Sequence, residues 1–139
     1  MDVIVLIGRI LFAALFVSSG AAHILQREAM AGYAGAKQVP SALLAVLVSG
    51  VMILVGGLSV ALGIWADLGA LLIVAFLVPT ALLMHRFWGE SDPGARQLEQ
   101  IQFTKDTALA GAALVIFAFF AYAGADLGLT ITGPVFDLR

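Results

Sequence analysis

The chain of 139 residues contains no cysteine, and only 12% of its residues are charged. The absence of cysteine excludes disulfides, thiol catalysis, iron–sulfur clusters and thiolate zinc sites. No basic run indicates nucleic acid as a partner, and the formal net charge is only −2. A nucleophile elbow, a phosphate-binding glycine loop and an HExxH motif are also missing. We therefore predict no catalytic residue, no metal site and no independent enzymatic activity.

The chain is rich in apolar residues. They make up 62% of the chain, and the mean hydropathy is +1.07. Soluble domains hold about 45–50% apolar and about 25% charged residues, so this surface must itself be apolar and its solvent lipid. A helix needs roughly 17–25 residues to cross a bilayer. Four apolar runs are that long, at about 3–25, 41–62, 68–84 and 107–123. The sequence predicts an all-α integral membrane protein, with a four-transmembrane-helix bundle as one domain over residues 1–139.

The connections between the runs predict the topology. A tight "GIWAD" joins the second and third runs, whereas the other two connections are long, "QREAMAGYAGAKQVP" and "HRFWGESDPGARQLEQIQFTK". Two crossings separate the long connections, so both lie on one side of the membrane. That side carries Arg27, Lys37, Arg86, Arg96 and Lys105, against Arg9 and Arg139 on the other. The positive-inside rule places the long loops in the cytoplasm, and both termini, with the tail 124–139, outside. We expect the first run to be a retained helix, because Asp2 stands where a signal peptide carries basic residues.

Ionisable side chains gather at the level of the long loops. His23 ends the first run, His85 ends the third, and Lys105 with Asp106 precedes the fourth. These four residues from three helices should meet near one membrane face, as candidates for a ligand site or a polar cluster. The two histidines have several interpretations: satisfied interfacial groups, proton carriers, donors to a quinone headgroup, or metal or haem ligands. No histidine pair at i and i+4 supports a metal.

Three residues directly after His85 predict an interfacial anchor. An arginine at this place, Arg86, typically binds lipid phosphates. Phe87 and Trp88 are typical of an aromatic belt at headgroup depth. Phe103 fits the same belt.

Arg9 lies about two turns inside the first run. A charge at full depth costs roughly 2.5–3.5 kcal/mol. At steps of three and four it shares a helix face with Ala13, Phe16, Gly20 and His23. This face should therefore look into the bundle. Two interpretations stay open: a polar group in a ligand cavity or subunit contact, or an internal salt bridge with Asp67 or Asp126.

Small residues predict how the helices pack. The second run contains Gly50, Gly56 and Gly57, and the fourth opens with the alanine- and glycine-rich stretch 108–113. Small side chains let helix backbones approach closely in a membrane. Pro79 inside the third run predicts a kink or a free carbonyl.

Four segments follow one another in a specific order: "GRILFAALFVSSGAAHI", "GYAGAKQVP", "GGLSVALGIWADLGALLIVAFLVPTALLMHRFW" and "QFTKDTALAGAAL". In that order they resemble the DoxX family over roughly residues 8–114. The resemblance implies a small, multi-pass protein of the bacterial inner (plasma) membrane. Family members are associated with membrane redox systems, including subunits that accompany quinol- or thiosulfate-linked oxidases. The family has no agreed catalytic set to carry over.

Three functions are consistent with these observations. The first is an accessory subunit of a membrane oxidoreductase or respiratory-chain complex, with the lipid bilayer and other membrane subunits as partners. The second is a stand-alone quinone-linked oxidoreductase component, with Arg9, His23 and His85 as polar contacts. The third is a bundle that binds or transports a small ligand. No resident cofactor is expected, and quinone or lipid are the candidate ligands.

Overall fold

The computed structural model describes residues 1–138, and this part of the chain contains helices and no strand. The helices are α1 (Asp2–Leu25), α2 (Arg27–Ala36), α3 (Ala42–Leu62), α4 (Ala66–Met84) and α5 (Pro93–Ala123), with the 3₁₀ turns η1 (Phe87–Gly89) and η2 (Gly124–Asp126). Four helices, α1, α3, α4 and α5, are long and apolar enough to cross a membrane. The predicted all-α membrane bundle of four helices is confirmed.

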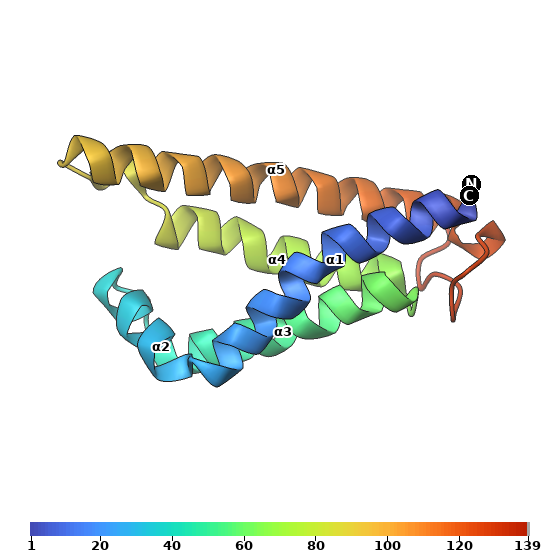
Figure 1. Cartoon of the computed structure of the whole chain (residues 1–139), viewed down its shortest axis with the longest axis horizontal. Coiled ribbons are helices and arrows are strands. Elements are labelled where there is room, and N and C mark those ends of the chain that lie inside the picture. The colour runs from blue at the N-terminus through green and yellow to red at the C-terminus, as the bar shows by residue number, and fades with distance from the viewer. Residues whose placement is uncertain (139) are drawn as a thin grey trace.

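The bundle consists of two helix pairs joined along one seam (Figure 1). Helix α1 packs on α3, α3 on α4, and α4 on α5, while the short α2 packs on the start of α3. The pairs lie close where both termini are found, which we call the terminal end. They diverge toward α2 and the α4–α5 connection, which we call the loop end. The two long connections therefore share one end and the termini the other, whereas the side that faces the cytoplasm stays a prediction.

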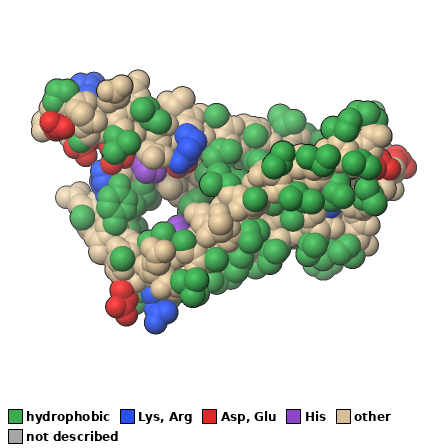
Figure 2. All heavy atoms as spheres, viewed as in Figure 1, with side chains coloured by type: hydrophobic (Ala, Val, Ile, Leu, Met, Phe, Trp, Pro, Cys, Tyr) green, Lys and Arg blue, Asp and Glu red, His purple; other side chains and the backbone are tan. Residues whose placement is uncertain are grey.

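The outer surface of the helices is apolar. Leu11 is 72% exposed and Val115 is 69% exposed, although both lie within membrane-length helices. Figure 2 shows hydrophobic side chains along the body of the molecule, with Lys, Arg, Asp and Glu gathered mainly at the loop end. An apolar surface of this extent is suited to lipid and costly in water.

Two glycines bring the helices into close contact. A Cβ atom at Gly50 would lie 2.6 Å from the Cβ of His23, and one at Gly56 would lie 2.9 Å from the carbonyl oxygen of Gly69. These positions set the approach of α3 to α1 and to α4, as the small-residue pattern predicts. In α5 only some of the small residues 108–113 contact other helices of the same chain. Ala110 and Ala113 are buried, whereas Gly111 is exposed with nothing near its Cβ position.

Two helical segments lie outside the predicted apolar runs. Helix α5 begins at Pro93 rather than at about Thr107, and α2 occupies a connection that the sequence left without structure. The Asp92 side chain accepts a hydrogen bond from the Ala95 amide at 2.8 Å, and Pro93 takes the first helical position. Capping and helix propensity extend a helix into water, where a search for apolar runs does not follow it. The extension places residues 93–106 in the same helix as the membrane-crossing segment.

Pro79 does not end α4, which continues to Met84. Because proline has no amide hydrogen, it leaves the carbonyl of Ala75 without its i+4 donor. One turn away, the hydroxyl of Thr80 donates to the carbonyl of Phe76 at 2.7 Å.

The tail folds back onto the terminal end. The Ile131 and Thr132 amides both donate to the Gly63 carbonyl, at 3.1 and 3.0 Å, and the Phe136 amide donates to Asp67 Oδ2 at 2.7 Å. Gly63 has a left-handed φ of 67° that suits glycine. The tail is thus bound by its own bundle, and its position outside the cell stays a prediction. Arg139, which the charge count includes, lies outside the described residues.

Candidate functional site

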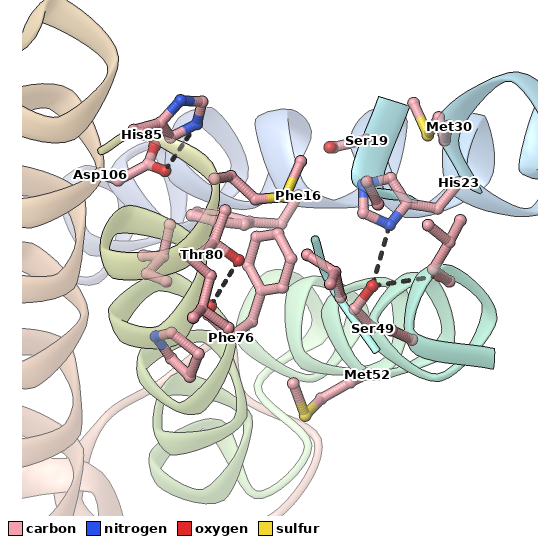
Figure 3. Close-up of a pocket in the computed structure, with 18 of the residues that line it drawn as sticks. Phe16, Ser19, His23, Met30, Ser49, Met52, Phe76, Thr80, His85 and Asp106 are labelled. Atoms are coloured by element: carbon pink, nitrogen blue, oxygen red, sulfur yellow. Dashed lines mark hydrogen bonds and ion pairs between the residues drawn. The ribbon is translucent and has the colours of Figure 1, made fainter. Parts of the chain in front are cut away.

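A cavity of about 520 Å³ lies between the helix pairs at the loop end. Its volume is within the range of small-molecule sites, about 300–1,000 Å³. The walls are mostly apolar, with Phe16, Met52, Phe76 and Leu77 among the lining residues. Figure 2 shows the hollow beside the gathered charges. Figure 3 shows polar side chains on two sides of it, His23 and Ser49 on one and His85 and Asp106 on the other.

His23 supplies the polar group on the α1–α3 side. Its Nδ1 lies 3.2 Å from Ser49 Oγ, and the Ser49 hydroxyl donates to the Val46 carbonyl at 3.1 Å. The His23 ring also has a hydrogen-bond contact with the Val46 backbone, so it is engaged with both Ser49 and Val46. The imidazole edge also packs against the ring of Phe76, with centroids 5.9 Å apart.

Glu99 is the centre of the ionic contacts at the loop end. Its Oε1 accepts from Lys37 Nζ at 2.6 Å and from the Tyr33 hydroxyl at 3.4 Å, and its Oε2 lies 2.8 Å from His85 Nδ1. Lys37 also pairs with Glu90 at 3.3 Å. Since Tyr33 and Lys37 follow α1 whereas Glu99 belongs to α5, these contacts join the diverging helix pairs.

The Glu99 carboxylate raises the pKa of two side chains that it contacts, Lys37 and Tyr33. Its hydrogen bond raises the pKa of the Lys37 ammonium above the ordinary value. Tyr33 is 51% exposed, and the pKa of its phenol is also raised, first by partial burial and then by the negative charge of Glu99. Lys37 is therefore held as a cation, and Tyr33 as a neutral donor.

Asp106 lines the cavity from α5 and is only 6% exposed. Its Oδ2 lies 3.6 Å from His85 Nε2, and its Oδ1 lies 4.0 Å from Lys105 Nζ. Both separations exceed a hydrogen bond. Lys105 is half exposed, and its ammonium donates to the side-chain carbonyl of Gln102.

The structure places all four residues of the predicted cluster around the cavity: His23, His85, Lys105 and Asp106. Glu99 was missed, because the sequence assigned it to a loop. With α5 beginning at Pro93, Asp106 follows Glu99 by seven residues in one helix, so the two share a face. The N-terminal capping signal at Asp92 and Pro93 was the available clue.

Arg9 does not line the cavity and lies at the terminal end. It is 3% exposed, and its guanidinium donates to the carbonyls of Val60, Ala61 and Leu129 at 2.9, 2.8 and 2.8 Å. The ring of Phe120 lies 5.8 Å from Arg9 Cζ. The buried face of α1, with Arg9, Ala13, Phe16 and Gly20, looks into the bundle as predicted. Arg9 fixes helix packing through main-chain carbonyls, while Asp67, a partner proposed from the sequence, accepts from the tail.

The three predicted anchor residues lie at the loop end. Arg86 Nη2 donates to the Lys37 carbonyl at 2.9 Å, which adds another bond between the helix pairs. Phe87, Trp88 and Phe103 form a cluster of edge-to-face rings with centroids 5.2–5.8 Å apart. Trp88 remains 53% exposed, and its insertion into headgroups stays a prediction.

The arrangement is suited to binding through hydrogen bonds in an apolar enclosure. Within residues 1–138, no three His, Asp or Glu side chains are placed to hold a metal ion. A ligand in the cavity would meet aromatic and aliphatic walls, an imidazole at one side and an imidazole with a carboxylate at the other.

Comparison with known proteins agrees with the sequence resemblance. The DoxX family model matches residues 4–86. The match contains His23, His85 and Arg86, whereas α5, with Glu99 and Asp106, follows it. No curated protein and no solved structure matches the chain. The chain is a small, multi-pass membrane protein, and it belongs to the DoxX family.

Proposed function

We propose that the protein binds a small amphiphile with a ring-sized headgroup, of the quinone type, in the loop-end cavity as a component of a membrane redox system. The observation that carries this proposal is the cavity of about 520 Å³ with polar groups on two sides. Its position in a lipid-solvated bundle gives an apolar ligand access from the membrane. This interpretation takes precedence over that of an accessory subunit, since the cavity is a feature that a purely structural subunit does not need.

The polar groups match such a headgroup in placement. A ring with polar substituents at opposite positions would reach His23 from one side and His85 or Asp106 from the other, with Phe16 and Phe76 against its faces. Aromatic walls and a few convergent polar groups are the usual composition of a ligand site. The rest of the ligand, an acyl or isoprenoid chain, would lie in the bilayer.

A binding measurement tests this proposal. Purified protein in lipid nanodiscs should bind 2-decyl-1,4-benzoquinone saturably, at a stoichiometry of one. Ala45 lines the cavity, so Ala45→Phe fills space that the headgroup needs and should weaken binding at least roughly tenfold. Ala118 is an exposed residue of α5 away from the cavity, so Ala118→Phe is the matched control and should bind like the parent. Non-saturable partitioning, or equal binding by both variants, would reject the cavity as the site.

An exposed glycine supports a second function, as an accessory subunit of a membrane oxidoreductase or respiratory complex. Gly111 faces outward from α5 with no atom within 4 Å of its Cβ position, and its neighbour Ala108 is also exposed. A partner helix could approach closely there. Gly111→Leu should abolish co-migration with partner subunits on native electrophoresis, whereas Gly8→Leu, at an equally open position on α1, should not. Migration as the isolated chain before any substitution would contradict this role.

The orientation and location are proposals of the same kind. The basic residues of the loop end, Arg27, Lys37, Arg86, Arg96 and Lys105, support a cytoplasmic loop end in a bacterial plasma membrane. The cavity would then open near the cytoplasmic face.

A further inference from the structure

Asp106 is a buried carboxylate with ion-pair contacts to His85 and Lys105 but no hydrogen bond within the described residues. It is 6% exposed and lines the cavity, and within residues 1–138 no hydrogen bond reaches either of its oxygens. Burial removes the water that would solvate this carboxylate, so a hydrogen-bond donor that reaches it stabilises its charge. The position therefore favours occupation by a molecule that carries a donor.

The two neighbouring basic side chains, His85 and Lys105, do not fill this role. His85 uses Nδ1 on Glu99 at 2.8 Å, and its Nε2 stays 3.6 Å from Asp106 Oδ2. The Lys105 ammonium is 4.0 Å away and donates to Gln102. Asp106 lines the cavity together with His85 and Lys105, so a hydroxyl of a ligand in the cavity can reach its carboxylate.

The charges at the loop end favour a neutral donor over a cationic one. Three acidic side chains, Glu90, Glu99 and Asp106, are accompanied by three basic ones, Lys37, Arg86 and Lys105. The cluster is thus balanced before a ligand binds. On the opposite side, the His23 imidazole also lines the cavity, where its Nδ1 lies 3.2 Å from Ser49 Oγ.

We infer that the cavity selects a hydroxyl-bearing headgroup, a phenol or hydroquinone, whose O–H donates to the Asp106 carboxylate. This inference rests on the proposed function and names the ligand class of the same site. Asp106 acts as a specificity residue, through a charge-assisted hydrogen bond that a ligand without a donor cannot form. His85 lies beside this acceptor, with its Nδ1 bound to Glu99 at 2.8 Å.

Two probes test the inference, one with hydroxyl donors and one in which methyl groups replace the hydroxyl hydrogens. Binding of 2-decyl-1,4-hydroquinone, kept reduced under argon, is compared with binding of its dimethyl ether in nanodiscs. A hydrogen bond to a charged acceptor should give the hydroquinone a preference of roughly tenfold or more. Asp106→Leu, which removes the acceptor without leaving a buried charge, should reduce this preference to about threefold or less. Asp106→Asn should retain an intermediate preference. Glu28→Gln removes an exposed carboxylate of α2 away from the cavity and should leave it unchanged.

The outcomes separate the two proposals. Equal binding of both probes by the parent protein, with both suppressed by Ala45→Phe, overturns the donor selection and leaves the ligand cavity in place. A preference that survives in Asp106→Leu, with the thermal melting of the variant unchanged, also overturns it. If neither probe binds saturably, the cavity proposal and the inference both fail.

Discussion

The two ends of the bundle both bury charged side chains, but they satisfy them differently. At the terminal end, Arg9 gives its donors to three main-chain carbonyls, and the tail closes over them. At the loop end, Glu99 and His85 are held by other side chains, and Asp106 beside them has no hydrogen bond within the described residues. An ionisable residue in a membrane helix is therefore a structural element where the backbone satisfies it. It is a candidate binding group where it borders a cavity and has a free hydrogen-bonding position.

The largest effect that this comparison predicts is at Arg9. Arg9→Ala should destabilise the protein by about 2–5 kcal/mol, because one buried and two part-buried carbonyls lose their donor. Thermal unfolding in detergent measures the loss. Arg9→Lys should recover only part of it, since a single ammonium cannot reproduce the guanidinium fork. Binding of 2-decyl-1,4-benzoquinone by the folded fraction should not change, and a selective loss of binding would mean that Arg9 belongs to the ligand site.

A smaller effect is expected at Glu99, which joins the helix pairs at the loop end. Glu99→Gln should weaken the contacts to Lys37 and His85 and let the pairs separate, at a cost of about 1–3 kcal/mol. The chain contains no cysteine, so spin labels at Gly32→Cys and Leu98→Cys report the separation without background. Pulsed dipolar spectroscopy should show a longer or broader distance distribution in Glu99→Gln than in the parent. An identical distribution would mean that packing, and not the ion pairs, holds the loop end together.

The smallest effect is a change in the titration of Tyr33. Burial and the charge of Glu99 both raise the pKa of this phenol. Its tyrosinate absorbance should therefore develop above the ordinary value of about 10. In Glu99→Gln the charge is gone, and separation of the helix pairs reduces the burial, so the midpoint should move down toward the ordinary value. Tyr122→Phe provides the background, because the chain has only two tyrosines. An upward shift would contradict the contact between Tyr33 and Glu99.

The sequence was sufficient to predict the elements that lipid solvation determines. Four apolar runs gave the four membrane helices, and the small residues Gly50 and Gly56 marked helix contacts, because both patterns depend on local composition. Placing His23 and His85 at one level followed from counting crossings, since a helix fixes the depth of its residues. That both line one cavity was visible only in the structure.

Features that depend on distant segments were not predictable. The carbonyl of Leu129 comes from the tail, so no pattern around Arg9 could identify it as a partner. The divergence of the helix pairs, which creates the cavity, depends on packing between helices that are distant in the sequence. Glu99 could have been predicted from the sequence. Recognising the capped start of α5 would have placed it on the same helix face as Asp106.

The central claim is that ligand binding is confined to the loop-end cavity, and photolabelling tests it most directly. The probe is an azido-substituted decyl-benzoquinone in nanodiscs, with cross-linked residues mapped by peptide mass spectrometry. We predict labels within residues 45–52 and 75–85, which contribute to the cavity wall, and suppression of these labels by excess 2-decyl-1,4-benzoquinone. Labels spread along the lipid-facing surface, or concentrated near Arg9 and the tail and insensitive to competitor, would contradict the account.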